Sequence, residues 1–274
     1  MARRPDTVAT GSHWRARPLV TASFAAHAVA AIEIAWQPAL WPWAAGLVIA
    51  DHLALAAAGL WPRSRALGPN LTRLPPERSA GRVAMTIDDG PDPEVTPRVL
   101  DILDAAGARA TFFCVGERVV RHAALARTIV ERGHSIENHS QRHVNYFSVL
   151  GPARMREEIV RAQWSIAEVT GDAPRFFRAP AGLRNPFLDP ILCDLDLRLV
   201  SWTRRGFDTV ARSADVVFNR LTRGLAAGDI VLLHDGHAAR TAAGDPVVLD
   251  VLPRVLARFG GAGLTSVTLR EALP

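Results

Sequence analysis

Residues 83–91 read VAMTIDDGP, a short apolar run that ends in two adjacent carboxylates. The apolar part, residues 83–87, is typical of a buried strand, and Asp-Gly-Pro is typical of the turn that follows one. Neighbouring side chains diverge at a strand end, so Asp88 and Asp89 can serve different partners, one a metal and the other a substrate. The same residues also make an ordinary turn, and this pair alone does not establish a site.

From Gly81 onward, short apolar runs alternate with amphipathic stretches, a pattern that predicts an α/β domain. Periodicity alone does not distinguish a closed barrel from an open doubly wound sheet. In both architectures functional residues gather at the carboxyl ends of the strands. Seven strands are expected, over residues 83–87, 110–115, 135–137, 175–177, 197–202, 230–233 and 264–268.

The composition is that of a folded protein and excludes several kinds of chemistry. The chain has 274 residues, 49% of them hydrophobic and 22% charged, which excludes a disordered or disulfide-scaffold protein. The sequence contains no lysine, which excludes Schiff-base catalysis and a Walker-type phosphate loop. The net charge of +5 comes from scattered arginines, so we expect no nucleic-acid partner. Cys114 and Cys193 are expected to be free thiols.

Polar residues follow five of the expected strands. The spacing of His139 and His143 predicts that both imidazoles share one face of a helical turn and bind one ion, unless they are surface histidines. With one carboxylate they would complete a three-ligand zinc site that leaves a position for water. The five groups are Asp88-Asp89, His139-Ser140-Gln141-Arg142-His143, Arg178-Ala179-Pro180-Ala181-Gly182, Trp202 with Asp208, and Leu232-Leu233-His234.

The order of these groups resembles the five motifs of the polysaccharide deacetylase family, also called the NodB-homology or carbohydrate esterase family 4 domain. Residues 85–91 (MTIDDGP) and 110–113 (ATFF) are also similar to that family. The resemblance extends over about residues 80–270. It implies a distorted (β/α)7 barrel and metal-dependent removal of an acyl group, expected to be acetyl, from an amide nitrogen on a sugar.

The resemblance also implies a metal centre and a general base. Asp89, His139 and His143 would bind a divalent metal, expected to be Zn²⁺, with a water molecule in the open position. Asp88 would take the proton from that water, and Arg178 would keep the Asp88 carboxylate ionised and oriented.

The remaining motif residues are expected to stabilise the leaving group, the oxyanion and the substrate. His234 would protonate the departing amine, and Asp208 would support its imidazolium. The backbone N–H of Ala181 would donate to the oxyanion. Residues expected to contact the substrate are Pro180, Trp202, Arg204, Arg205 and Leu232.

The sequence departs from the family pattern at positions near the substrate. The third motif usually has an aromatic residue where Ala181 stands. The fourth usually reads Asp-x-x-Asp-Trp, whereas residues 205–209 read Arg-Gly-Phe-Asp-Thr. The cleft would therefore lack two aromatic walls that stack on a polymer. Arg204 and Arg205 would add two groups that bind anions, unless they are solvated loop charges.

The N-terminal part of the chain differs from the rest. No arginine lies between Arg17 and Arg63, and this apolar stretch predicts two membrane-spanning helices, over residues 19–36 and 43–60. Arginines flank the pair on both sides, so the positive-inside rule places both ends in the cytoplasm. The polar residues Glu33 and Asp51 favour an alternative, a soluble helical hairpin packed on the catalytic domain. If the hairpin is in a membrane, these two acids must face each other, a neighbour or the interface.

The chain is thus divided into an N-terminal region (1–61), a Pro-rich linker (62–79) and a catalytic domain (80–274). Glu157 and Glu158 are expected on a solvated helix face. Histidines that match no motif are expected to be structural or exposed, and these are His27, His52, His122, His134 and His237.

These features predict an inner-membrane hydrolase whose catalytic domain faces the cytoplasm. Its expected substrate is an acylated amino sugar carried on a polyprenyl phosphate, with the phosphate near Arg204 and Arg205. One alternative is a deacetylase of peptidoglycan or an exported polysaccharide, with the domain outside the membrane. Another is a membrane-tethered carbohydrate-binding pseudoenzyme.

Overall fold

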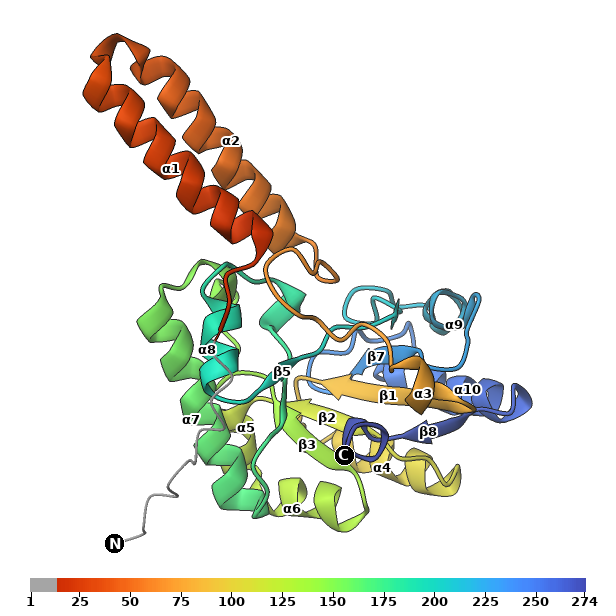
Figure 1. Cartoon of the computed structure of the whole chain (residues 1–274). Coiled ribbons are helices and arrows are strands. Elements are labelled where there is room, and N and C mark those ends of the chain that lie inside the picture. The colour runs from red at the N-terminus through yellow and green to blue at the C-terminus, as the bar shows by residue number, and fades with distance from the viewer. Residues whose placement is uncertain (1–13) are drawn as a thin grey trace, which may run out of the picture.

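The computed structural model describes residues 14–274 and shows a helical hairpin attached to an α/β domain (Figure 1). The domain is built on one parallel sheet with the strand order β5-β4-β3-β2-β1-β7-β6, and β8 pairs with β1. All seven expected strands are present, and β6, which was not expected, is added. The strands are β1 (Arg82–Asp88), β2 (Thr111–Cys114), β3 (Ser135–Asn138), β4 (Phe176–Phe177), β5 (Arg198–Leu199), β6 (Arg204–Arg205), β7 (Ile230–His234) and β8 (Thr265–Val267).

The sheet curves into a distorted barrel whose two edges do not pair with each other. Strands β5 and β6 form these edges, although they follow each other closely in the sequence. Part of residues 62–79, the expected linker, lies in the gap between them. Leu71 pairs in parallel with Val200, and Arg73 pairs in the antiparallel sense with Asp229. This segment therefore belongs to the folded domain and completes the barrel wall.

Helices cover the sheet and bury its apolar side chains. The central strands β1 and β7 are buried along almost their whole length, as expected for parallel strands covered on both faces. The amphipathic helices pack their apolar faces against them, and α10 alone buries eight residues. The main helices are α4 (Thr96–Ala105), α5 (Gly116–Arg121), α6 (Ala123–Glu131), α7 (Pro152–Thr170), α8 (Leu188–Asp194), α9 (Ala214–Thr222) and α10 (Val247–Gly261).

The N-terminal hairpin consists of α1 (Pro18–Trp36), a short 3-10 turn (Pro38–Leu40) and α2 (Trp41–Leu60). Both helices are long and apolar enough to cross a membrane. The hairpin extends away from the α/β domain, and only 11% of each apolar stretch is buried (Figure 1). It is therefore not packed along the domain in the way that the soluble alternative requires.

The polar residues inside the hairpin contact one another. Asp51 on α2 accepts a hydrogen bond from the Ser23 hydroxyl on α1 at 2.7 Å, and His27 Nδ1 lies 3.8 Å from the same carboxylate. Glu33 instead lies in the last turn of α1, near the hairpin tip. Asp51 thus faces the neighbouring helix, one of the arrangements expected for an acid at membrane depth. Two of the arginines that precede the hairpin and support the positive-inside assignment, Arg3 and Arg4, lie outside the described residues.

Candidate active site

The structure brings all five polar groups together at the carboxyl ends of the strands. Asp88 and His234 end the neighbouring strands β1 and β7 and are register partners. His139 and Arg178 directly follow β3 and β4. Asp88, His139 and His234 line a cavity of about 360 Å³. Ala181, Trp202, Arg205 and Leu232 also line it. The placement of chemistry at this end of the sheet was predictable because parallel strands bring their carboxyl ends to one side.

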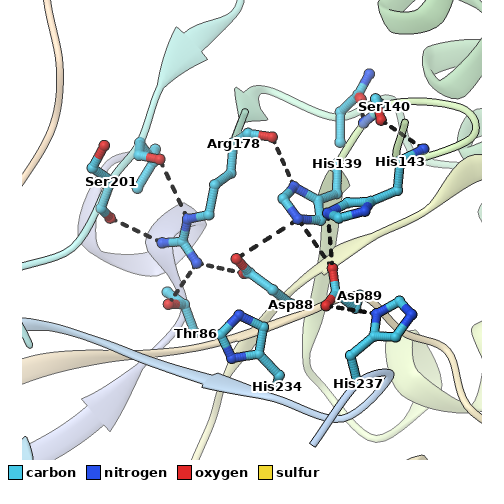
Figure 2. Close-up of polar contacts among 12 residues, drawn as sticks. Thr86, Asp88, Asp89, His139, Ser140, His143, Arg178, Ser201, His234 and His237 are labelled. Carbon is cyan, nitrogen blue, oxygen red and sulfur yellow. Dashed lines mark hydrogen bonds and ion pairs between the residues drawn. The ribbon is translucent and has the colours of Figure 1, made fainter. Parts of the chain in front are cut away.

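Asp89, His139 and His143 form a cluster with the composition of a metal site. One ligand atom from each lies within 4.8 Å of the others. Asp89 Oδ1 lies 3.3 Å from His139 Nε2 and 3.2 Å from His143 Nε2, and it is buried without a hydrogen-bond partner (Figure 2). A buried carboxylate oxygen without a hydrogen bond is costly unless a cation balances it. The residues therefore fit a divalent metal, and two imidazoles with one carboxylate suit zinc.

The protonation states in this cluster also suit metal binding. The Nδ1 atom of His139 lies 2.7 Å from the Arg178 carbonyl, to which it donates, so Nε2 carries the free lone pair. Burial lowers the pKa of His143 to about 4, with a smaller contribution from the neighbouring His139, which keeps the His143 imidazole neutral at pH 7. Burial raises the pKa of Asp89, but its close contacts with His139 and His237 outweigh burial and hold this pKa well below its usual range.

The loop of residues 139–143 holds the two histidines without forming the expected helical turn. Ser140 and His143 have φ angles of 66° and 52°, which a right-handed helix does not allow. Hydrogen bonds fix the loop instead: the Asn138 side chain accepts from the Ser140 N–H, and the Ser140 hydroxyl accepts from the His143 N–H. The two imidazoles do lie close together, as the i, i+4 spacing indicated, but the backbone that brings them together is not helical.

Glu158 on α7 is buried, which corrects the expectation of a solvated face. Its carboxylate accepts from the Arg142 N–H at 2.9 Å and from Arg142 Nε at 2.6 Å. Only the neighbouring Glu157 is exposed, where it pairs with Arg161 at 3.3 Å. Glu158 therefore anchors the loop that carries the histidines.

Asp88 and Arg178 form a buried ion pair beside the metal cluster. Arg178 Nη1 lies 2.5 Å from Asp88 Oδ1 and 2.9 Å from the Thr86 hydroxyl (Figure 2). The other nitrogens of the guanidinium donate to the carbonyls of Val200 and Ser201. The second oxygen of Asp88 lies 3.8 Å from His139 Nε2 and points toward the cluster. Arg178 thus fixes one carboxylate oxygen and leaves the other facing the cavity.

His234 and Asp208 form a second buried pair on the opposite wall. Asp208 Oδ1 lies 2.9 Å from His234 Nδ1, and Asp208 Oδ2 accepts from the His234 N–H at 2.7 Å. Burial lowers the pKa of His234, but the Asp208 charge and hydrogen bond outweigh it and raise the pKa to about 9. His234 is therefore an imidazolium at neutral pH, the form that donates a proton.

The expected substrate residues divide into those that reach the cavity and those that do not. Ala181 lies at a φ of 55°, at the middle of the 3-10 turn that Pro180 begins. The Arg204 guanidinium instead turns away, and it binds Asp229 at 2.8 Å and the carbonyls of Arg223 and Gly224. Arg204 is thus a structural residue, whereas Arg205 faces the cavity.

Two residues near the metal cluster were missed because they match no motif that we used. His237 Nδ1 lies 3.0 Å from Asp89 Oδ2, and the ring lines the cavity. Asp235 is buried and accepts from the Thr96 hydroxyl at 2.5 Å, and burial raises its pKa to about 7. The sequence HDGH over residues 234–237 carried the only signal, a second histidine close to a strand end.

Comparisons with known proteins agree with this geometry. Residues 76–200 match the family profile described as polysaccharide deacetylase. The peptidoglycan-N-acetylglucosamine deacetylase of Bacillus cereus is 32% identical over 193 residues, which cover 70% of this chain and 87% of the relative. The chain belongs to the polysaccharide deacetylase family. It is a hydrolase of the carbon–nitrogen bond that joins an acetyl group to an amino sugar.

Other members of the polysaccharide deacetylase family show the range of related proteins. A chitooligosaccharide deacetylase of Bradyrhizobium is 34% identical over 57% of this chain and 71% of its own. The family 4 carbohydrate esterase of Streptomyces lividans, solved with acetate, is 32% identical, with a TM-score of 0.62 over 70% of this chain and 94% of its own. A family pseudoenzyme from Bacillus anthracis is 25% identical, with a TM-score of 0.66 over 75% of this chain and 69% of its own.

Proposed function

We propose that this protein is a metal-dependent deacetylase that hydrolyses the N-acetyl group of an amino sugar. The observation that carries the proposal is the convergence of three elements on one cavity. These are the Asp89-His139-His143 cluster, the Asp88–Arg178 pair and the His234–Asp208 pair. A bound divalent cation, for which zinc is the best fit, supplies Lewis-acid polarisation of the acyl carbonyl and lowers the pKa of a water molecule.

The chain's own residues account for the proton transfers. Asp88 accepts a proton from the attacking water through its cavity-facing oxygen, while Arg178 holds the other oxygen. The water oxygen adds to the carbonyl carbon, and the Ala181 N–H donates to the oxyanion. His234 then protonates the sugar nitrogen as the C–N bond breaks, which gives acetate and a free amine. A pseudoenzyme would be expected to lack a metal ligand or the base. In this chain the base Asp88 and the metal-binding residues Asp89, His139 and His143 are all present.

The dependence on metal tests the proposal directly. Treatment of the full-length protein with a chelator is expected to abolish acetate release from N-acetylglucosamine oligomers or lipid-linked N-acetylglucosamine, and Zn²⁺ is expected to restore it. His139→Ala is expected to lose both the metal, measured by elemental analysis, and the activity. A chelated protein that stays fully active would contradict the proposal. Stoichiometric metal without acetate release from any N-acetyl sugar would favour the binding protein.

The His234–Asp208 pair predicts a decline in activity at high pH. His234 acts in its protonated form, and its pKa is raised to about 9, so kcat/KM is expected to fall as the pH rises through about 9. Asp208→Asn removes the negative charge that stabilises the imidazolium and is expected to move this decline to lower pH. Asp215→Asn, at an exposed acid on α9, is the control. A high-pH limb that stays in place in Asp208→Asn would remove His234 from the role of acid.

The hairpin and the substrate cavity also favour a finer assignment. We infer that the hairpin anchors the enzyme in the cell membrane with its domain on the cytoplasmic side, and that the substrate is an acylated amino sugar on a polyprenyl phosphate. This is supported by the apolar helices, by the arginines at their base, and by Ala181 and Thr209, which stand where the family pattern usually has aromatic residues. The alternative, peptidoglycan or an exported polymer as substrate, requires the domain outside the membrane. Protease accessibility of the domain in right-side-out vesicles distinguishes the two topologies.

A further inference from the structure

The base of the hairpin is fixed against the loop that carries the third active-site motif. The Arg184 N–H donates to the Gly59 carbonyl at 3.2 Å, and a Cβ at Gly59 would collide with the Arg184 backbone. The Ser201 hydroxyl donates to the Pro62 carbonyl at 2.6 Å. A Cβ at Gly182 would lie 2.5 Å from Trp202 and 2.8 Å from Pro62. The last turn of α2 and the residues that follow it thus pack directly against the catalytic loop.

A groove of about 470 Å³ connects this base to the catalytic cavity. Trp61, Pro62 and Arg63, directly after α2, line its hairpin end. Trp202 and Arg205 line both the groove and the catalytic cavity, so the two spaces meet at these side chains. A ligand that leaves the catalytic cavity along this route therefore passes Arg205 and reaches the end of the hairpin.

The groove is positively charged, and three of its four arginines lack acidic partners in the described part of the chain. No Asp or Glu lines it, and Arg63, Arg205 and Arg220 have no ion pair among the residues that the structure describes. Arg205 Nε is buried and has no hydrogen-bond partner. Arg204 also lines the groove, but Asp229 already neutralises it. An unpaired guanidinium next to a catalytic cavity is available to bind an anion from outside the chain.

Aromatic rings hold these guanidinium groups in place. The Arg205 guanidinium lies 4.9 Å from the centre of the Trp202 ring and 4.9 Å from that of Phe207, and the Arg220 guanidinium lies 5.6 Å from the centre of the same Phe207 ring. Phe207 adopts a φ of 59°, an uncommon conformation for a bulky residue, which points to a constraint on its ring. Stacking fixes the planar group of Arg205 without consuming its N–H donors, so these donors stay free for a ligand. Arg220 uses one donor, because its Nη1 donates to the Gly206 carbonyl at 3.4 Å.

We infer that this groove is a phosphate subsite, in which Arg205, aided by Arg63 and Arg220, binds the phosphate that joins the acetylated sugar to a membrane lipid. The inference rests on the proposed function and adds the residues that select the substrate. The sugar occupies the catalytic cavity, the phosphate lies at Arg205, and the lipid chain follows the groove toward the hairpin. Specificity then comes from Arg205, which stands where the family pattern usually has an acid.

The test compares two soluble substrates that differ only in the phosphate. One is N-acetylglucosamine joined to octanol by a phosphodiester, and the other is octyl N-acetylglucosaminide. Arg205→Gln is expected to lower kcat/KM for the phosphodiester by about 10- to 100-fold, the range for a lost charge-assisted hydrogen bond. The fold-loss in kcat/KM for the neutral glycoside is expected to be at least ten times smaller. The matched control, Arg127→Gln on the exposed face of α6, is expected to change neither value.

Each outcome of this comparison supports or overturns the phosphate subsite. Equal losses on both substrates would overturn the subsite and assign Arg205 a role in shaping the cavity. Weaker binding of Arg205→Gln to phosphatidylglycerol vesicles, with an unchanged preference between the substrates, would show that the anion is a bilayer headgroup, which also overturns it. Failure of the proposed function is distinguishable, because the zinc-loaded wild-type protein would then release acetate from neither substrate.

Discussion

Asp88→Asn is expected to lower acetate release by about 10²- to 10⁴-fold, the range for loss of a general base. The amide keeps the shape of the side chain but cannot accept the proton of the attacking water. Asp88 lies outside the Asp89-His139-His143 cluster, so the variant is expected to bind metal with unchanged stoichiometry. The measurement is kcat for acetate release together with metal content by elemental analysis.

The neighbouring carboxylate provides the matched comparison for this variant. Asp89→Asn is expected to lose both metal and activity, because Asp89 Oδ1 is the atom that faces both imidazoles. The two substitutions are adjacent and chemically identical, so a difference in metal content reflects position alone. If Asp88→Asn also lost its metal, Asp88 would be part of the metal site and not the base. Retention of activity would remove Asp88 from the mechanism.

The strands and the site could be predicted because both depend on local patterns. Short apolar runs indicated the strands, and polar residues that follow them must meet at one edge of a parallel sheet. The resemblance to a family then gave each of Asp89, His139 and His143 a role that the residue types alone left open. The distances show that these residues do gather, but their roles remain predictions.

What the sequence did not predict depends on contacts between distant residues. The helix pattern alone predicts that Glu158 is solvated, but the loop that carries Arg142 packs over it and buries it. Arg204 and Arg205 look equivalent as neighbours in the sequence, but strand β6 turns them to opposite sides, one toward Asp229 and the other toward the cavity. The segment around Leu71 shows no periodicity, yet it fills the gap in the barrel because the sheet edges leave unpaired backbone groups there.

Arg178→Met is expected to destabilise the protein by about 3–5 kcal/mol, the range for a buried ion pair that loses one partner. Methionine retains much of the volume, so the cost is electrostatic. The variant leaves the buried Asp88 carboxylate without a counter-ion and the carbonyls of Val200 and Ser201 without a donor. The expected result is a Tm lowered by roughly 6–20 °C in a thermal unfolding experiment, at about 2–4 °C per kcal/mol.

A double variant separates this electrostatic cause from poor packing. Asp88→Asn in the Arg178→Met background removes the uncompensated charge, so the double variant is expected to be more stable than Arg178→Met alone, with a coupling of about 1–3 kcal/mol. Purely additive losses would mean that Arg178 acts through its contacts with the backbone and with the ring of Phe113, 4.1 Å away, and not through Asp88. Both variants are expected to be inactive, so stability is the property that distinguishes these explanations. A buried arginine that balances the base couples folding to catalysis, because the charge that makes Asp88 useful is the one that burial penalises.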